Sequence, residues 1–488
     1  MTDSLTRSRL DHLEALRNRG IDPFPARVPA VQQIRPAVER FENLAAEEHS
    51  GDRVTIAGRV IAIRRMGKAS FLDLRDGTGR LQVHAVVDGL GETVYEELGG
   101  VDIGDFLSVS GEIFRTKRGE LTVEIEEYTF LAKAIRPLPE KWHGLKDAEL
   151  RHRHRSLDLI ANDVARTAFV SRSRMISSIR RGLDGRGFIE VETPTLQPIA
   201  GGALARPFVT HHNALDVDLY MRIALELYLK RVLVGGIDRV YEIGKCFRNE
   251  GVSTEHNPEF TMLELYQAYA DYETMMDLAG ELIADALNAT IGTLSVRFKE
   301  NDIDFGTPWP RVKMVDLVEE TSGIDVSSLS ADEIDRQAGE KGIELPAGTA
   351  GKKVESLFER FAEPTLVQPT FVCDYPIDIS PLAKKCKNDE RLVERFELFA
   401  GGMELANAFT ELNDPIDQRE RFEAQERLRD AGDDEAHRID EDFLFALEHG
   451  MPPTGGMGVG IDRLAMVATG LGSIRDVILF PTLRGRRD

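Results

Sequence analysis

The hydrophobic pattern of this chain changes its period near residue 133. Between residues 53 and 133, apolar and polar residues alternate in short runs such as residues 54–60 and 121–125. This alternation predicts half-buried β-strands. Beyond residue 146, stretches with helical spacing are interspersed with strands in no repeating strand–helix–strand order. The expected arrangement is therefore a small all-β domain followed by a large α+β domain.

The predicted N-terminal strands are five short segments separated by turns, among them residues 76–79. So many short strands in so short a stretch are typical of a small closed barrel, and the five-stranded OB barrel is the natural candidate. Gly58 and Gly111 lie where a barrel strand has to bend. The expected division is a helical extension over residues 1–50, the barrel over residues 51–134, a linker over residues 135–150 and a second domain over residues 151–488.

The second domain is expected to contain a mainly antiparallel sheet flanked by helices. Helical spacing predicts helices near residues 163–185, 225–234 and 275–287. The sequence contains neither a G-x-G-x-x-G segment that opens a helix after a strand nor a G-x-x-x-x-G-K-[ST] segment. A nucleotide, if bound, would therefore use neither of these two common phosphate-binding loops.

The composition excludes several classes of protein. With 42% hydrophobic and 30% charged residues among 488, the chain is typical of a globular protein. It has no run of about 18 apolar residues and no apolar signal core, so neither a membrane nor an extracellular location is expected. Three scattered cysteines suit neither a disulfide framework nor a zinc site, which favours the cytoplasm.

The net charge of −22 argues against a protein that coats nucleic acid non-specifically. A local basic patch is still compatible with a nucleic-acid partner. The most acidic stretch, residues 430–442, is interpreted as a solvated loop followed by the start of a helix.

Residues 247–266 predict a strand, a loop and a second strand. Alternation puts four side chains on one face of the second strand: Phe260, Met262, Glu264 and Tyr266. This face is either a polar outer surface or the floor of a pocket. The apolar runs on both sides favour the pocket, with Arg248 across the hairpin.

Residues 396–404 are interpreted as a tight hairpin that turns at Ala400 and Gly401. This register pairs Glu397 with Glu404, and two opposed carboxylates destabilise a sheet. Either both side chains point to water or a divalent cation lies between them. Because Mg²⁺ prefers one or two carboxylates together with phosphates, the pairing favours a magnesium site.

The strand that follows carries three candidate binding side chains on one face, namely Asn407, Phe409 and Glu411. Strict alternation would put Glu404 on the opposite face. A β-bulge near Leu405 would bring Glu404 to the same side, and the sequence leaves this point open.

Residues 455–464 predict a glycine-rich strand that enters a helix at about Asp462. Glycines there allow a ligand or another backbone to approach closely. Arg463 in the first helical turn opposes the helix dipole, which indicates a bound anion or a stacking partner. Residues 187–194 add a helix end and a strand that stops at Pro194.

These four segments resemble the signature motifs of class II aminoacyl-tRNA synthetases. Residues 187–194 are similar to motif one, residues 247–250 to motif two and residues 458–463 to motif three, and the hairpin lies between the last two. Together with the barrel, they resemble the subgroup that loads lysine, aspartate and asparagine. Four further runs resemble its bacterial lysine branch, namely residues 66–71, 206–213, 226–230 and 407–415. The whole resemblance extends from about Leu10 to Pro481.

The resemblance implies a homodimeric ligase that activates L-lysine with ATP and loads it onto the lysine tRNA, with no membrane partner. It implies lysine binding by Gly202, Glu226, Glu264, Tyr266, Asn407, Phe409 and Glu411. It implies ATP binding by Arg248, Glu250, His256, Asn257, Phe260 and Arg463, of which Arg248 and Arg463 are the catalytic residues. Glu397 and Glu404 would hold Mg²⁺, and Phe71, Gln82 and Arg64 would contact the anticodon. Arg65 and Lys68 would add phosphate attraction.

The residues themselves also favour lysine. Glu226, Glu264 and Glu411 suit an ammonium group, and lysine has two. An aspartate or asparagine ligase is the first alternative, but aspartate would need a cation, and none of the candidate lysine-binding positions carries one. Some relatives carry glycine at Ala406 and Ala408 or arginine at Met403. Both variants are familiar in the family and would change only the pocket volume.

Two further alternatives lie outside tRNA loading. A paralogue that attaches a lysine-like residue to a protein usually lacks the barrel, which this chain has. A non-catalytic RNA-binding relative would have little reason to keep four residues together, namely Arg248, Glu397, Glu404 and Arg463.

Overall fold

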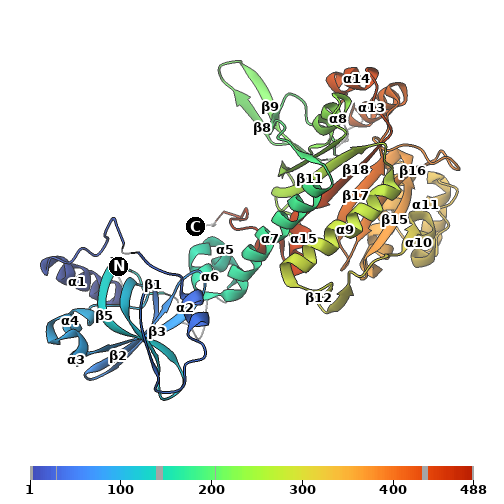
Figure 1. The fold of residues 1–488 in the computed structure, drawn as a ribbon. Coiled ribbons are helices and arrows are strands. Elements are labelled where there is room, and N and C mark those ends of the chain that lie inside the picture. Colours follow the sequence, from blue (N-terminus) through green and yellow to red (C-terminus); the bar gives the residue numbers. More distant parts are fainter. Residues whose placement is uncertain (1–3, 29, 139–146, 204, 431–437, 486–488) are drawn as a thin grey trace. The chain divides into compact units, whose positions relative to one another are not determined.

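The computed structural model describes residues 4–28, 30–138, 147–203, 205–430 and 438–485. The chain forms two compact units, Met1–Leu145 and Lys146–Asp488 (Figure 1). Residues 431–437 of the acidic stretch and residues 139–146 of the expected linker lie outside the described residues. Within the described ranges, no helix is long and apolar enough to cross a membrane.

The first unit contains a closed five-stranded barrel in the order β1-β2-β3-β5-β4, which confirms the expected OB barrel. Its strands are β1 (His49–Met66), β2 (Ala69–Arg75), β3 (Arg80–Val86), β4 (Phe106–Arg115) and β5 (Leu121–Ala132). Its helices are α1 (Ser4–Asn18), α2 (Ile34–Arg40), α3 (Val87–Leu90) and α4 (Glu92–Leu98). Alternate strand residues such as Ile56, Val83 and Val109 are fully buried in the barrel core.

Gly111 is required by a close approach of two barrel strands. A Cβ atom at this position would lie 1.7 Å from the carbonyl oxygen of Glu124 on β5. The register of β4 against β5 shifts between Ser110 and Gly111, where the strand bends. Gly58 is similar, because its Cβ would lie 2.9 Å from the backbone of Arg75. A side chain at either position would clash with the backbone of the neighbouring strand.

The second unit is built on an eight-stranded sheet in the order β14-β15-β16-β17-β18-β11-β10-β6. The edge pairs β14/β15 and β10/β6 are parallel, and the pairs between them are antiparallel, as expected. The strands of this sheet are β6 (Ile189–Glu190), β10 (Arg239–Phe247), β11 (Glu259–Ala268), β14 (Arg311–Lys313), β15 (Thr370–Pro376), β16 (Leu392–Phe399), β17 (Glu404–Thr410) and β18 (Thr454–Gly460). Smaller sheets are formed by β7 (Leu196–Gln197), β8 (Val209–His212) and β9 (Val217–Met221), and by β12 (Ser295–Phe298) and β13 (Asn301–Asp304).

Helices cover one face of this sheet through the largest hydrophobic core. They are α7 (Asp163–Gly185), α9 (Tyr272–Ile291) and α15 (Ile461–Thr469), and Figure 1 shows α9 lying across the sheet. The other described helices are α5 (Ala148–Arg153), α6 (Arg155–Ala161), α8 (Glu226–Val234), α10 (Met314–Ser322), α11 (Ala331–Glu340), α12 (Ala350–Leu357), α13 (Pro415–Asp430), α14 (Glu441–Glu448) and α16 (Ile474–Val477), with a π-helical turn at Phe358–Ala362 and 3₁₀ turns at Glu363–Thr365 and Ile377–Ile379. The three helices expected from the sequence correspond to α7, α8 and α9.

The hairpin between β16 and β17 corrects the predicted register. Phe399 pairs with Glu404, and Glu397 pairs with Asn407 rather than with Glu404. The loop is longer than predicted, since the amide of Ala400 donates to the carbonyl of Met403 at 3.0 Å. Leu398 pairs with Ala406, so Leu405 is the extra residue of a β-bulge. The sequence left open whether a bulge occurs near Leu405, and the structure contains it.

Candidate active site

The face of the large sheet opposite α9 carries two adjoining pockets. On β11, Leu263 and Leu265 pack into the helix-covered core. The side chains that alternate with them line the pockets, which confirms the shared face predicted for Phe260, Met262, Glu264 and Tyr266. Alternation along each strand is therefore the local reason why a polar site lies on a largely buried sheet.

We call the first of these the carboxylate pocket. Six of the seven residues expected to hold lysine line it, namely Gly202, Glu226, Glu264, Tyr266, Asn407 and Phe409. The seventh, Glu411, is fully buried and is not part of the lining. A Cβ atom on Gly456, which does line the pocket, would lie 1.9 Å from Oε1 of Glu411. Glu411 thus lies directly behind the pocket wall.

Glu264 lines the carboxylate pocket, and its hydrogen bonds come from neutral donors. The amide of Leu225 donates to its Oε1 at 3.1 Å, and the hydroxyl of Tyr266 donates to its Oε2 at 3.1 Å. Burial and the charge of Glu226 raise the pKa of Glu264 to about 7. A cation placed beside this carboxylate would favour its ionised form.

The other two glutamates share a buried lysine that the sequence analysis missed. Nζ of Lys230 donates to Oε1 of Glu226 at 2.5 Å and forms an ion pair with Glu411. Lys230 has no exposed surface. Burial acts to lower its pKa, but the charges of Glu226 and Glu411 outweigh that effect and raise it. Lys230 is therefore protonated at neutral pH.

Arg395 is a second cation of this region. Its Nε donates to Oδ1 of Asn407 at 3.1 Å, and its Nη2 donates to Oε1 of Glu397 at 2.6 Å. Its guanidinium carbon lies 4.5 Å from the ring centroid of Tyr375, whose hydroxyl donates to Glu397. None of the seven candidate positions carries a cation, as expected, but Arg395 and Arg248 are part of the pocket lining.

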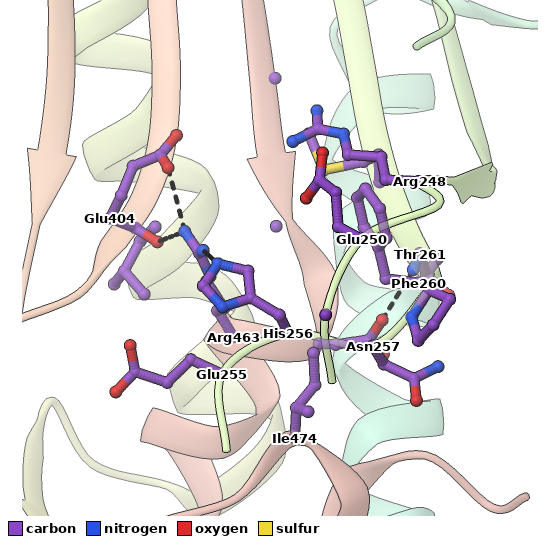
Figure 2. A pocket seen from close by; sticks show the side chains of 17 residues that line it. Arg248, Glu250, Glu255, His256, Asn257, Phe260, Thr261, Glu404, Arg463 and Ile474 are labelled. Atoms are coloured by element: carbon purple, nitrogen blue, oxygen red, sulfur yellow. Dashed lines mark hydrogen bonds and ion pairs between the residues drawn. The ribbon is translucent and has the colours of Figure 1, made fainter. Parts of the chain in front are cut away.

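The second pocket, which we call the arginine pocket, contains all six residues expected to bind ATP. In Figure 2, Glu404, Arg463 and His256 lie on one side of it and Arg248, Glu250 and Phe260 on the other. The pocket is thus flanked by an aromatic ring from β11 and a guanidinium from the first turn of α15. This arrangement suits a flat, electron-rich ring between them.

Arg463 is held in place by two neighbours. Its Nη1 donates to Oε2 of Glu404 at 2.9 Å, and its Nη2 donates to Nε2 of His256 at 3.2 Å. Burial and the charge of Arg463 lower the pKa of His256, so His256 accepts this bond as a neutral ring. Asn257 has a different role. Its amide donates to the carbonyl of Glu259 at 2.5 Å and accepts from the amide of Thr482 at 3.1 Å, so it shapes the loop.

Arg248 lies where the two pockets meet, because it lines both of them. Its guanidinium carbon is 5.1 Å from the ring centroid of Phe260. Its Nε is buried without a hydrogen-bond partner among the described residues. Unpaired buried N–H groups are costly, so this donor suits an anionic ligand at the junction.

Glu397 and Glu404 suit a hard divalent cation. Both line the carboxylate pocket, and burial together with the charge of Glu404 raises the pKa of Glu397 to about 7 despite Arg395. Mg²⁺ beside them would lower this pKa and would match the preference for two carboxylates plus phosphates. No cluster of three metal-ligating side chains occurs in the described ranges, so the remaining ligands would be water and phosphate.

The three anticodon candidates also lie together on the barrel. The ring of Phe71 stacks on His84 with centroids 4.3 Å apart, and the guanidinium of Arg64 lies 5.9 Å from the Phe71 centroid. Gln82 is buried, accepts from Nη2 of Arg64 at 2.6 Å and donates to Thr122 at 3.0 Å. Phe71 and Arg64 thus present a stacking surface, and the hydrogen bond to Gln82 holds Arg64 in place. The sequence alone did not indicate that His84 stacks on Phe71.

Two family models match the sequence. The model of class II tRNA synthetases for aspartate, lysine and asparagine matches residues 147–484, and that of the OB-fold nucleic acid binding domain matches residues 54–131. A lysine–tRNA ligase of Moorella thermoacetica is 55% identical, with 98% of each chain covered. A lysine–tRNA ligase of Bacillus subtilis is 51% identical, covering 98% of this chain and 97% of the relative.

Proposed function

The chain belongs to the class II tRNA synthetases for aspartate, lysine and asparagine, and we propose that it is a lysine–tRNA ligase. It activates L-lysine with ATP to lysyl-adenylate and then transfers lysine to the 3′ end of the lysine tRNA. The observation that favours lysine over aspartate is the hydrogen bonding of the buried Glu264 carboxylate. Among the described residues it accepts hydrogen bonds from neutral groups alone, so it is available to the side-chain ammonium of lysine.

The residues of the junction account for the first reaction. Lysine in the carboxylate pocket directs its own carboxylate toward Arg248, which also faces the arginine pocket. Arg248 there contacts the α-phosphate of ATP, whose adenine lies between Phe260 and Arg463. The lysine carboxylate attacks the α-phosphate in line and pyrophosphate leaves. Positioning and charge neutralisation supply the rate enhancement, and no enzyme nucleophile is involved.

Glu397 and Glu404 would hold Mg²⁺ in this reaction. The ion neutralises the phosphate charges when it is bound. Arg395 and Tyr375 keep the Glu397 carboxylate oriented toward the pocket. Glu404, like Arg248, lines both pockets, so the ion would lie where the binding sites for ATP and lysine adjoin.

The remaining parts of the chain take the other roles. The barrel of residues 51–134 binds the anticodon through Phe71, Arg64 and Gln82, and residues 151–488 carry out catalysis. Residues 1–50 extend the barrel, and residues 135–150 link the two domains. We further propose a homodimer in the cytoplasm, with Pro194 at or near the interface between its subunits.

The test is amino-acid-dependent ATP–pyrophosphate exchange without tRNA, followed by aminoacylation of lysine tRNA. Lysine should support exchange, and aspartate, asparagine and ornithine should support little or none. Exchange with aspartate instead would overturn the assignment to lysine. No exchange with any amino acid would favour a non-catalytic RNA-binding relative.

A further inference from the structure

Arg172 on α7 lies outside both pockets, and the proposed reaction gives it no role. Its Nε and Nη2 donate to Oδ1 of Asp462 at 3.1 and 2.7 Å. The same Nη2 donates to the hydroxyl oxygen of Thr261 at 2.9 Å. The Asp462 side chain is 2% exposed and that of Arg172 is 20% exposed. This largely buried pair joins α7 to the start of α15 and to β11.

Asp462 and Thr261 are the sequence neighbours of the two residues that flank the arginine pocket. Asp462 precedes Arg463, and Thr261 follows Phe260. Both also line this pocket. The other oxygen of the Asp462 carboxylate, Oδ2, accepts from the amide of Thr261 at 2.6 Å. One carboxylate thus connects the segment that carries the aromatic ring with the segment that carries the guanidinium.

The pairing of β11 with β18 ends just before these segments. Its last pair is Met262 with Gly460, and beyond it β18 passes into α15. The Asp462 carboxylate therefore takes the place of the next rung of the ladder. Because the register of the two strands ends there, the gap between the Phe260 ring and the Arg463 guanidinium depends on this side-chain bridge.

We propose that Arg172 is a positioning residue for the nucleotide, which fixes Asp462 and thereby sets the gap between Phe260 and Arg463 in which the adenine lies. This inference rests on the proposed function. Without the arginine, the Asp462 carboxylate is a buried charge that has lost its cation, and it turns toward water or takes up a proton. Either response weakens its bond to Thr261 and lets the start of α15 move. ATP binding then suffers, because stacking depends on the separation of the two flanking groups.

The experiment compares Arg172→Met and Arg172→Lys with the wild-type full-length chain. It measures kcat and KM for ATP in lysine-dependent exchange, and the separate affinities for ATP with Mg²⁺ and for lysine by calorimetry. Arg172→Met should raise the KM for ATP and weaken ATP binding by at least about tenfold, because a small displacement of a binding group is costly. Lysine affinity should change by less than about twofold, since the lysine site has no partner in common with the pair. Arg172→Lys keeps the charge but loses the forked contact, so its ATP affinity should be intermediate.

A double variant tests the bridge separately from the cation. Arg172→Met/Asp462→Asn removes both charges together, and the side-chain carbonyl oxygen of the new amide can still accept from the amide of Thr261. It should recover most of the ATP affinity lost in Arg172→Met, because no buried charge is left unpaired. A folded double variant that binds ATP no better than Arg172→Met would overturn the role of the bridge.

Arg180→Met is the matched control on the same helix. Nε of Arg180 donates to both carboxylate oxygens of Glu190, at 2.9 and 3.1 Å, in a more exposed pair. Arg180 also lies outside both pockets. This variant should leave the KM for ATP unchanged.

The outcomes separate the inference from the proposed function. If the wild-type chain shows no lysine-dependent exchange, the proposed function fails, and the ATP affinities of the variants still test the bridge. If Arg172→Met binds ATP as wild type does, the role of Arg172 is overturned. A lower kcat with an unchanged KM for ATP, or an equal loss of lysine affinity, indicates general destabilisation and overturns it too. If Arg172→Met does not fold, Arg172→Lys decides: weaker ATP binding with normal lysine binding supports the inference, and normal ATP binding overturns it.

Discussion

Nη1 of Arg463 lies 2.9 Å from Oε2 of Glu404, and it also donates to the carbonyl oxygen of Glu404 at 3.0 Å. This pair joins the first turn of α15 to the first residue of β17, just before the bulge at Leu405. The sequence assigned Arg463 to the nucleotide and Glu404 to the metal. In the structure this carboxylate pairs with Arg463 and lines the carboxylate pocket together with Glu397, the other candidate metal ligand.

The first prediction concerns this shared carboxylate. Glu404→Gln should raise the Mg²⁺ concentration for half-maximal ATP–pyrophosphate exchange by about tenfold or more, because one of two candidate ligands loses its charge. Lysine affinity measured without ATP or Mg²⁺ should stay the same. Glu359→Gln, which removes an exposed carboxylate from the rim of the same pocket, is the control. An unchanged Mg²⁺ dependence in Glu404→Gln would argue against a metal at this position.

The second prediction concerns the pH dependence of lysine binding. The pKa of Glu264 is raised from 4.5 to about 7, so the folded protein holds a proton there that the unfolded chain has released. Without lysine, this group makes the free energy of unfolding fall as pH rises from about 4.5 to about 7. Lysine prefers the ionised carboxylate. Its affinity should therefore increase as pH rises toward about 7 and level off above it.

Calorimetry in buffers of different ionisation enthalpy measures the proton released when lysine binds. Release near pH 7 is expected in the wild-type chain and should disappear in Glu264→Gln, which should also bind lysine far more weakly. Equal lysine affinity at pH 6 and pH 8 would contradict the role of Glu264.

A third prediction uses the close packing at Gly456. A Cβ atom there would lie 1.9 Å from Oε1 of Glu411 and 2.5 Å from the ring of Tyr266. Gly456→Ala should reduce kcat/KM for lysine by about tenfold to a hundredfold, because overpacking moves two residues of the pocket wall. Gly458→Ala on the same strand is the comparison, since its Cβ would meet the flexible Cε of Met262 at 3.3 Å. Equal effects of the two variants would show that Gly456 has no special packing role.

The fourth prediction separates the barrel from the catalytic unit. Phe71→Leu removes the stacking surface beside Arg64 and His84 and should lower kcat/KM for tRNA charging by about tenfold or more, the loss expected for one stacked base. ATP–pyrophosphate exchange without tRNA should not change. Phe130→Leu, which alters a buried core ring of the same barrel, controls for general destabilisation. A loss of exchange in Phe71→Leu would mean that the barrel variant disturbs the whole chain.

Local patterns in the sequence predicted the face of β11 correctly. Alternation has a period of two residues and depends on nothing outside the strand, so Glu264 and Tyr266 were assigned to one face before any contact was known. Helix α7 and the five-stranded barrel were also predicted from local periodicity, with helical spacing for α7 and alternation for the barrel strands. The signal for Lys230 was present too, since Glu226 and Lys230 stand four residues apart on one helix.

The sequence by itself thus determined the two kinds of domain, the strand faces and the types of residue available for binding, because backbone periodicity is local. Tertiary structure alone decided the register of the β16–β17 hairpin, which depends on the longer loop and on the bulge at Leu405. It also decided which charges compensate each other. Lys230 meets Glu411 across a long stretch of chain, and the strength of that contact comes from burial, which no local pattern specifies.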